Sequence, residues 1–202
     1  MGRILIHLAF MEEQRMGKRM FAIAEQISGT QIRTLRKKLG LSQAEFGRLV
    51  SISAKTVARW ETAQDMISGP IVTIAKLLEE NPQIVMQLEV PVLKLPLRLW
   101  YMKENSVCTM IDVDERRRLV EIHNYTNDRM NRAFGADENP TFEAYESFLE
   151  SRCFPRTRDK IKLELKRLNL PFYDPLMIIE KTGGRMAEDQ FWIRMERKQS
   201  EH

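Results

Sequence analysis

LSQAEFGRLVSISAKTVARWE, residues 41–61, is the stretch that decides the fold of the first part of this chain. Ser42 is followed three residues later by Glu45, and this spacing forms a capping box that satisfies backbone amides at the start of a helix. The pattern therefore predicts a helix over residues 43–50. A short turn follows, and Ser53 is placed to cap a second helix.

Each of these two helices has a distinct apolar and polar side. The predicted apolar side of the first helix consists of Ala44, Phe46, Leu49 and Val50. Gly47 presents no side chain and lets another helix approach closely. In the second helix Val57 and Trp60 are expected to face inward. The opposite side of that helix is formed by Lys55, Thr56 and Arg59. An outward, cationic side of this kind can enter a DNA major groove.

Flanking segments add helices and positive charge. Thr30–Leu39 is predicted to be helical, with Ile32, Leu35 and Leu39 inward. Gly69-Pro70 is expected to open a further helix over Ile71–Glu80, whose apolar residues are Ile71, Ile74, Leu77 and Leu78. Between residues 29 and 60 there are seven basic residues and one acidic residue, whereas the whole chain carries a net charge of +4. A helical hairpin with merely solubilising charges is the alternative, but this concentration of charge favours DNA binding.

In order, spacing and residue type, residues 29–82 resemble the lambda-repressor/Cro-like (XRE-type) helix-turn-helix family, through IRTLRKKLGLSQAEFGRLVSISAKTVARWE and the later LLEENP. The resemblance implies binding to double-stranded DNA as a homodimer. It implies that Gln43 contacts backbone phosphate. It also implies a reading surface on the protein that faces the bases or flanking phosphates. This surface consists of Ser53, Ala54, Lys55, Thr56 and Arg59. Arg33 and Arg36 of the preceding helix are further DNA-binding candidates, Arg36 through phosphate.

Two other positions are notable in this resemblance. Ser51 stands in the turn where the family usually has glycine. If Ser51 adopts a left-handed conformation, its cost relative to glycine is about 1 kcal/mol, which a packed domain tolerates. Trp60 corresponds to the structural aromatic residue of the family and is expected to be buried.

Composition and breaks in the pattern divide the chain further. With 43% hydrophobic and 30% charged residues, 202 residues are enough for two small cores. Residues 1–28 are predicted to be a leader, partly helical or disordered, whose apolar run Ile4–Met11 is too short to cross a bilayer. The expected localisation is cytoplasmic, and no association with a membrane is expected. The predicted boundaries are a helix-turn-helix domain at 29–82, a proline-containing linker at 83–96, a small α+β domain at 97–195 and a tail at 196–202.

The second domain is expected to contain an antiparallel meander covered by helices, which makes the chain α+β overall, after an all-α first domain of four to five helices. The predicted strands are Leu97–Met102, Val107–Val113 and Leu119–Tyr125. The predicted helices are Thr141–Ser151, Pro155–Leu168 and Leu176–Lys181, and Phe191-Trp192-Ile193 is expected to be a last short strand or apolar anchor. Cys108 and Cys153 are expected to be buried thiols.

Residues 97–195 resemble, less specifically, the small N-terminal subdomain of HipA-like toxin kinases. The resemblance consists of a helix ending with Arg152 and Pro155, the later Arg158, and a closing acid-x-aromatic-Trp-Ile pattern at residues 189–193. It implies partner-binding roles for Arg152, Arg158 and Trp192. It further implies a HipA-like kinase toxin as a possible partner.

No residue set suggests an enzyme, a metal site or a cofactor. The chain lacks the glycine-rich loop and catalytic loop of a kinase core, and its three histidines are dispersed. Asp112, Asp114 and Glu115 cluster, but the three arginines that follow favour a solvated turn.

The sequence is therefore compatible with two classes of function. The favoured one is a sequence-specific transcriptional regulator, an antitoxin-like or mobile-element repressor whose C-terminal domain binds a protein. The alternative is an interaction adaptor that uses the helix-turn-helix only for dimerisation. Salt dependence separates them, because DNA binding weakens steeply with salt.

Overall fold

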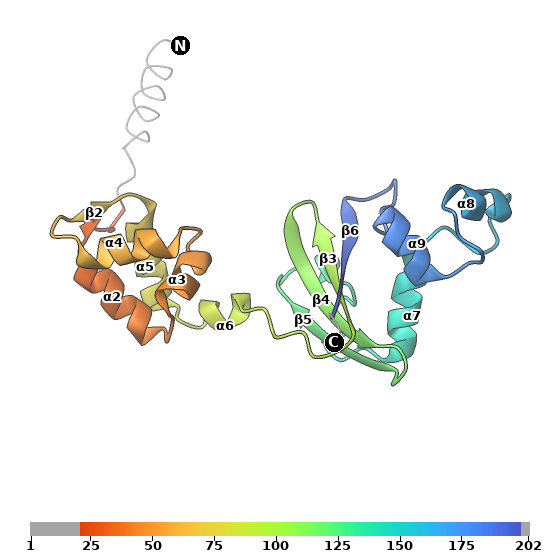
Figure 1. Ribbon diagram of the computed structural model, residues 1–202, viewed down its shortest axis with the longest axis horizontal. Coiled ribbons are helices and arrows are strands. Elements are labelled where there is room, and N and C mark those ends of the chain that lie inside the picture. The colour runs from red at the N-terminus through yellow and green to blue at the C-terminus, as the bar shows by residue number, and fades with distance from the viewer. Residues whose placement is uncertain (1–20, 199–202) are drawn as a thin grey trace, which may run out of the picture. The chain divides into compact units, whose positions relative to one another are not determined.

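The chain forms two compact units, the first ending at Leu88 and the second beginning at Glu89 (Figure 1). This computed structural model describes residues 21–198, so the predicted leader run Ile4–Met11 lies outside the described residues. Among the described helices, none is long and apolar enough to cross a membrane.

The first unit is mainly helical, with a two-stranded antiparallel ribbon formed by β1 and β2. Its elements are β1 (Gln26–Ile27), α2 (Gly29–Lys38), α3 (Gln43–Leu49), α4 (Ala54–Thr62), β2 (Ile67–Ser68), α5 (Pro70–Glu80) and α6 (Ile84–Leu88). Two elements lie outside the expected domain range of 29–82. β1 belongs to the range assigned to the leader, and α6 lies within the range assigned to the linker.

Local capping interactions begin the three central helices. The Ser42–Glu45 capping box is confirmed, and Ser28 forms a second one with Gln31 at the start of α2. Ser53 caps α4, because its hydroxyl accepts a hydrogen bond from the amide of Thr56. These short-range contacts explain why α3 and α4 begin where the sequence predicts, and why α2 begins at Gly29, one residue before the predicted Thr30.

The turn between α3 and α4 depends on a left-handed residue, Ser51, and on a close backbone contact at Gly47. Ser51 has φ 60°, so it adopts the left-handed conformation whose cost the sequence predicts only conditionally. A Cβ atom on Gly47 would lie 2.7 Å from the carbonyl oxygen of Ile52. Glycine at this position therefore lets the turn fold directly onto α3.

The core of the first unit agrees with most of the predicted inward positions. Its buried side chains are Ile32, Leu35, Phe46, Val57, Ile71, Val72, Ala75 and Leu78. Three predictions were wrong in detail. Ala44 is exposed, Leu77 is 51% exposed, and Trp60 packs on the core only partly buried. In α5 the buried positions 71, 72, 75 and 78 follow one helical stripe, which leaves Leu77 on its outer side.

The second unit contains an antiparallel four-stranded sheet in the order β5-β4-β3-β6. Its elements are β3 (Leu97–Lys103), β4 (Ser106–Asp114), β5 (Leu119–Asn124), η1 (Arg129–Asn131), α7 (Phe142–Ser151), α8 (Ile161–Arg167), α9 (Pro175–Thr182) and β6 (Phe191–Arg197). The expected meander is therefore present. Its last strand, β6, is longer than predicted, includes part of the expected tail and pairs along the whole of β3.

The helices and the sheet enclose the larger core, with α7 contacting β5 and α9 contacting β6. Fully buried members include Leu99, Ile111, Tyr145, Ile178 and Ile179. Cys108 and Cys153 are free, buried thiols, as predicted.

Helix α8 begins later than predicted. The expected helix Pro155–Leu168 is instead a turn followed by α8, because Lys160 adopts a left-handed conformation immediately before Ile161. A left-handed residue cannot continue a right-handed helix, so the regular hydrogen bonding starts only after it.

The assignment of the acidic cluster to a solvated turn holds for exposed Glu115 and was wrong for the other two members. Asp112 and Asp114 are buried on β4. Asp112 receives two hydrogen bonds from the Arg98 guanidinium, at 2.6 and 2.7 Å. The partner of Asp112 is thus a residue on the neighbouring strand, whereas Asp114 accepts hydrogen bonds from the backbone amides of Arg116 and Arg117 in the turn.

Candidate DNA interface

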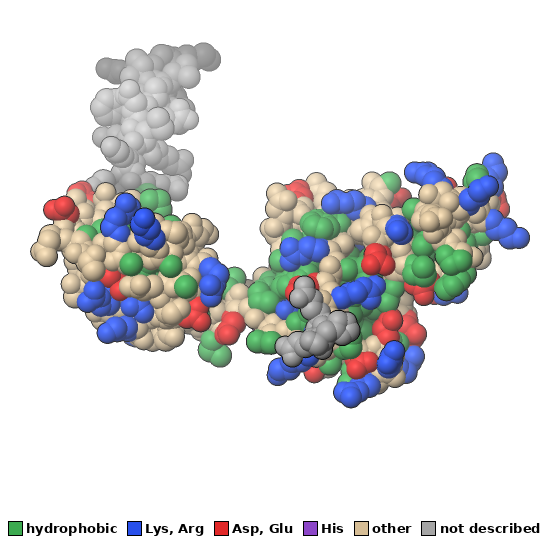
Figure 2. All heavy atoms as spheres, in the orientation of Figure 1, with side chains coloured by type: hydrophobic (Ala, Val, Ile, Leu, Met, Phe, Trp, Pro, Cys, Tyr) green, Lys and Arg blue, Asp and Glu red, His purple; other side chains and the backbone are tan. Residues whose placement is uncertain are grey.

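Helix α4 presents the predicted reading surface of the first unit. Ser53, Ala54, Lys55 and Arg59 are exposed, whereas Thr56 is half-buried. Among residues 21–198, no carboxylate lies within ion-pair distance of Lys55 or Arg59. On the face of the first unit seen in Figure 2, Lys and Arg side chains occupy several separate places, and Asp and Glu side chains are visible on the same face. Both cations on α4 are therefore available to an anionic partner.

Two hydroxyl groups at the start of α4 bond to each other. Ser53 Oγ lies 2.9 Å from Thr56 Oγ1 and also accepts the Thr56 amide at 3.1 Å. This arrangement fixes the first turn of α4. The side chains that remain free to extend outward from the helix are then the longer Lys55 and Arg59.

Glu61, near the end of α4, connects all three helices of the motif. Its side chain is 1% exposed. Its carboxylate accepts hydrogen bonds from Arg36 on α2, at 2.6 and 3.1 Å, and from Gln43 on α3, at 2.9 Å. Arg33 adds a hydrogen bond to the Glu61 backbone carbonyl at 3.0 Å. One buried carboxylate thus sets how α2, α3 and α4 are held together.

The electrostatics of this network follow from its hydrogen bonds. The Arg36 guanidinium, followed by the Gln43 amide and the charges of Arg36 and Arg33, holds the pKa of Glu61 below its usual range against the opposing effect of burial. The pKa of Arg36 is raised, chiefly by the same hydrogen bond. Both groups are therefore charged at neutral pH.

The network gives three of the predicted DNA-binding residues a place in the scaffold. Arg36 is only 12% exposed and also donates to the carbonyl of Leu41 at 2.7 Å, so its donors are directed inward. Arg33, on α2, is about half-exposed, and its guanidinium contacts Glu61 near the C-terminal end of α4. Gln43 is held by Glu61 at the first position of α3, where its amide orientation is fixed. We therefore assign Arg36 to the scaffold and retain Arg33 and Gln43 as candidates for phosphate contact.

Sequence reasoning missed Glu61. The charge count that singled out this region ended at Trp60, one residue before it. A single acid directly after a strongly basic segment was an available signal, because an isolated carboxylate among so many cations is favourably placed for an internal ion pair. Its partners lie 18 and 25 residues away, beyond the range of helical spacing rules.

Of the three predicted partner-binding residues of the second unit, Arg152 and Arg158 line a common pocket, and Trp192 does not belong to it. Arg152 is buried and donates to Asp189, to the carbonyl of Gly184 and to that of Phe191. Trp192 is partly buried, and its indole N–H donates to the Glu104 carbonyl at 2.7 Å. Arg158 is exposed. Arg152 therefore holds the end of α7 to the loop before β6, which is a structural role.

Comparison with known proteins agrees with this geometry in the first unit. Residues 32–79 match the helix-turn-helix family. The first unit is therefore a helix-turn-helix domain of the Cro/C1 (XRE) type, a class that binds DNA. Over 57 residues the chain is 32% identical to antitoxin HigA-2 of Vibrio cholerae serotype O1 (strain ATCC 39315 / El Tor Inaba N16961). That match covers 28% of this chain and 55% of the relative, so the chain spans about half the length of the curated protein it matches.

Proposed function

We propose that the protein is a sequence-specific transcriptional regulator that binds an operator through α4 as a homodimer and acts as an antitoxin-like repressor. The observation that carries this proposal is that Lys55 and Arg59, exposed on a helix that Glu61 fixes to its neighbours, have no ion-pair partner within the described part of the chain. Because the backbone of α4 is held in place, binding to phosphates and base edges has to order only the two side chains and not the helix that carries them. The likeness to an antitoxin supports the regulatory role.

Dimeric binding has a geometric consequence for the operator. Two copies of α4 enter successive major grooves only if the half-sites are about one helical turn, 34–36 Å, apart. The operator is therefore an inverted repeat with that spacing.

Arg59→Ala is expected to weaken binding to the selected operator by about 1–3 kcal/mol and to relax preference at one or two base pairs, because an exposed guanidinium reads base edges bidentately. The measurement is selection of bound duplexes from a random DNA pool by the purified full chain, followed by titration of the enriched duplex. Lys76→Ala is the matched control, since it removes one exposed cation from α5.

The pattern of loss identifies the role of Arg59. An equal loss on operator and random DNA would assign Arg59 to phosphate only, and would lower the slope of log K against log salt by about 0.9. No enriched duplex at low salt would overturn the proposal and favour the adaptor alternative.

The second half of the proposal is that the second unit binds a protein partner, whose level then controls operator occupancy through linked binding. A HipA-like kinase as this partner stays a prediction from the sequence resemblance. The expected result is a kinase-like reading frame beside this gene whose product co-purifies with the full chain. A neighbouring kinase that does not bind would contradict it.

A further inference from the structure

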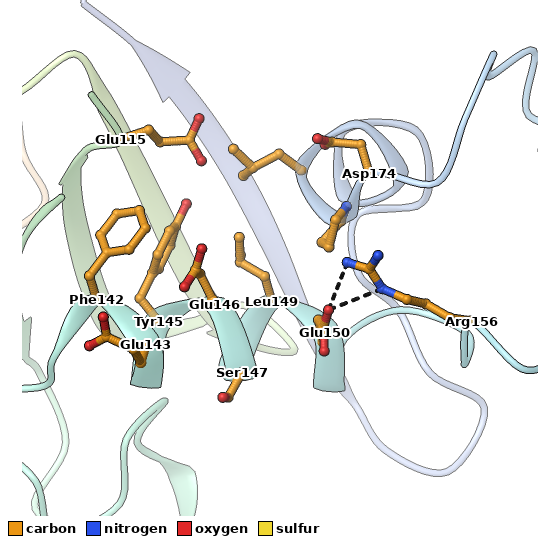
Figure 3. Close-up of a pocket in the computed structure, with 12 residues that line it drawn as sticks. Glu115, Phe142, Glu143, Tyr145, Glu146, Ser147, Leu149, Glu150, Arg156 and Asp174 are labelled. Carbon is orange, nitrogen blue, oxygen red and sulfur yellow. Dashed lines mark hydrogen bonds and ion pairs between the residues drawn. The ribbon is translucent and has the colours of Figure 1, made fainter. Parts of the chain in front are cut away.

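A pocket of about 490 Å³ lies on the second unit, between the turn after β4, helix α7 and the start of α9 (Figure 3). We call it the acidic pocket, because five carboxylates line it, from Glu115, Glu143, Glu146, Glu150 and Asp174. Its volume is within the range of about 300–1,000 Å³ typical of ligand sites. Three separate chain segments supply these acids, so the fold brings them together.

The positive charges nearby neutralise only part of this cluster. Arg156 pairs with Glu150 at 2.9 Å. Arg118 pairs with Glu143 at 2.6 Å and reaches Glu146 only at 3.4 Å. In Figure 3 Glu143 points away from the pocket, whereas Glu146 rises beside Tyr145.

Glu115 and Asp174 have no ion-pair partner among the described residues. Asp174 caps α9 by accepting the Met177 amide at 2.8 Å. Loss of hydration, and next the neighbouring Asp174 carboxylate, raise the pKa of Glu115. Exposed Glu115 and half-buried Asp174 therefore give this side of the acidic pocket a negative potential, which the charge of Arg197 offsets only in part.

Tyr145 provides independent evidence of an incomplete site. Its side chain is 0% exposed, yet its hydroxyl has no hydrogen-bond partner within the described part of the chain. Figure 3 shows this hydroxyl pointing from α7 toward Glu115, inside the acidic pocket. Buried polar groups are nearly always satisfied, whereas this hydroxyl lacks a hydrogen-bond partner among the described residues, and a donor that bridges its oxygen and the neighbouring carboxylates would supply one.

The walls define the shape of that donor. Phe142, Leu149 and Leu176 give the acidic pocket an apolar lining beside its carboxylates. The described residues contain no group of three side chains suited to a metal ion. A ligand with an apolar stem and a flat cationic end, carrying several N–H donors, matches both the walls and the acids.

We propose that the acidic pocket binds an arginine side chain presented by a partner protein. The guanidinium donates to Glu115, Glu146 and the Tyr145 hydroxyl, and its stem packs on the apolar wall. This inference rests on the proposed function only in that the partner of the second unit carries the arginine. The pocket itself belongs to the second unit, so its binding is measured separately from DNA binding.

The test is NMR titration of the full chain with a blocked peptide, Gly-Gly-Arg-Gly-Gly, and with versions containing lysine or citrulline. The arginine peptide is expected to shift resonances of the turn after β4 and of α7. The citrulline peptide, which keeps the shape and loses the charge, is expected to bind at least about tenfold more weakly. Equal binding of arginine and citrulline, or no shift with any peptide, would overturn the proposal.

Two variants and one control locate the binding. Glu115→Gln and Tyr145→Phe are each expected to weaken binding of the arginine peptide by about tenfold. Glu121→Gln, which removes an exposed carboxylate from β5, is expected to leave it unchanged. Loss in the control equal to that in Glu115→Gln would show attraction by overall charge only and would contradict a pocket.

Tyr145→Phe also has a readout without ligand. If the hydroxyl lacks a partner, the variant is expected to melt at the same or a higher temperature than the wild type. A clear fall in Tm would show that the hydroxyl is already satisfied in the free protein, and would remove the evidence for a missing donor. Stronger binding of spermidine than of the arginine peptide would assign the acidic pocket to a free polyamine and overturn the assignment to a protein side chain.

The same preparations separate this inference from operator binding. Glu115→Gln is expected to bind the selected operator as the wild type does. Normal operator binding with no peptide binding would reject the acidic pocket alone, and peptide binding without an operator would reject the DNA-binding proposal alone.

Discussion

Replacing Glu61 with alanine is expected to lower the free energy of unfolding of the first unit by about 3–5 kcal/mol. The substitution removes the acceptor for Arg36 and Gln43 and leaves an almost buried guanidinium without its counter-charge. The measurement is urea unfolding followed by the fluorescence of Trp60, in a Trp100→Phe/Trp192→Phe background that removes the two tryptophans of the second unit. Glu79→Ala, an exposed position on α5, is the control.

Acid provides a second measure of the same network. Because the pKa of Glu61 is lower in the folded state than in the unfolded chain, its ionised form stabilises the fold above the unfolded value of about 4.3. That contribution is lost as pH falls through the lower, folded pKa. The wild-type first unit should therefore lose stability below about pH 4 more steeply than Glu61→Gln. Parallel curves for the two proteins would contradict the network, as would an unchanged urea midpoint in Glu61→Ala.

Asp112→Ala is expected to destabilise the second unit by a similar amount, about 3–5 kcal/mol. The Arg98 guanidinium is 3% exposed and lies 5.4 Å from the centre of the Trp100 ring. Without Asp112, this cation is buried and loses both of its short hydrogen bonds. Urea unfolding monitored by the tryptophans of the second unit measures the loss, and Asp159→Ala, at an exposed position, serves as control.

The double variant Arg98→Met/Asp112→Leu distinguishes two explanations of that loss. Apolar side chains of similar volume remove the unpaired charge, so the double variant is expected to be nearly as stable as the wild type, or more stable. If it is as unstable as Asp112→Ala, the pair contributes through packing specific to these two residues. The charge explanation would then be wrong.

The parts of the fold that could be predicted are those set by near neighbours in sequence. Ser42 and Glu45 are three residues apart, and their mutual hydrogen bonds fix the start of α3 without help from the rest of the chain. The cap that Ser53 provides at the start of α4 was likewise predicted from residues within one turn. The helix-turn-helix and its exposed cations were accessible to sequence reasoning for this reason.

The parts that could not be predicted depend on residues distant in sequence. Pairing of β6 with β3 is decided by the packing of the whole second unit. The sequence of one strand does not identify the other as its partner. The same holds for Glu61 with Arg36, and for Asp112 with Arg98 across two strands. Alternation and helical spacing identify which side chains face inward, but they do not identify the partner that each polar side chain meets there.

The sheet order also affects how the protein is made. β3 is paired on one side by β4, the next strand to be synthesised, but its other neighbour, β6, is produced only after all three helices of the second unit. Until then a nascent chain on the ribosome exposes one bare edge of β3, and bare strand edges readily pair with other chains. The DNA-binding unit can fold early during translation, whereas the second unit depends on late-emerging residues to close its sheet. Ribosomes that stall between α9 and β6 would therefore release a chain with a complete helix-turn-helix and a sheet that lacks β6. The exposed edge of β3 in that chain would favour aggregation.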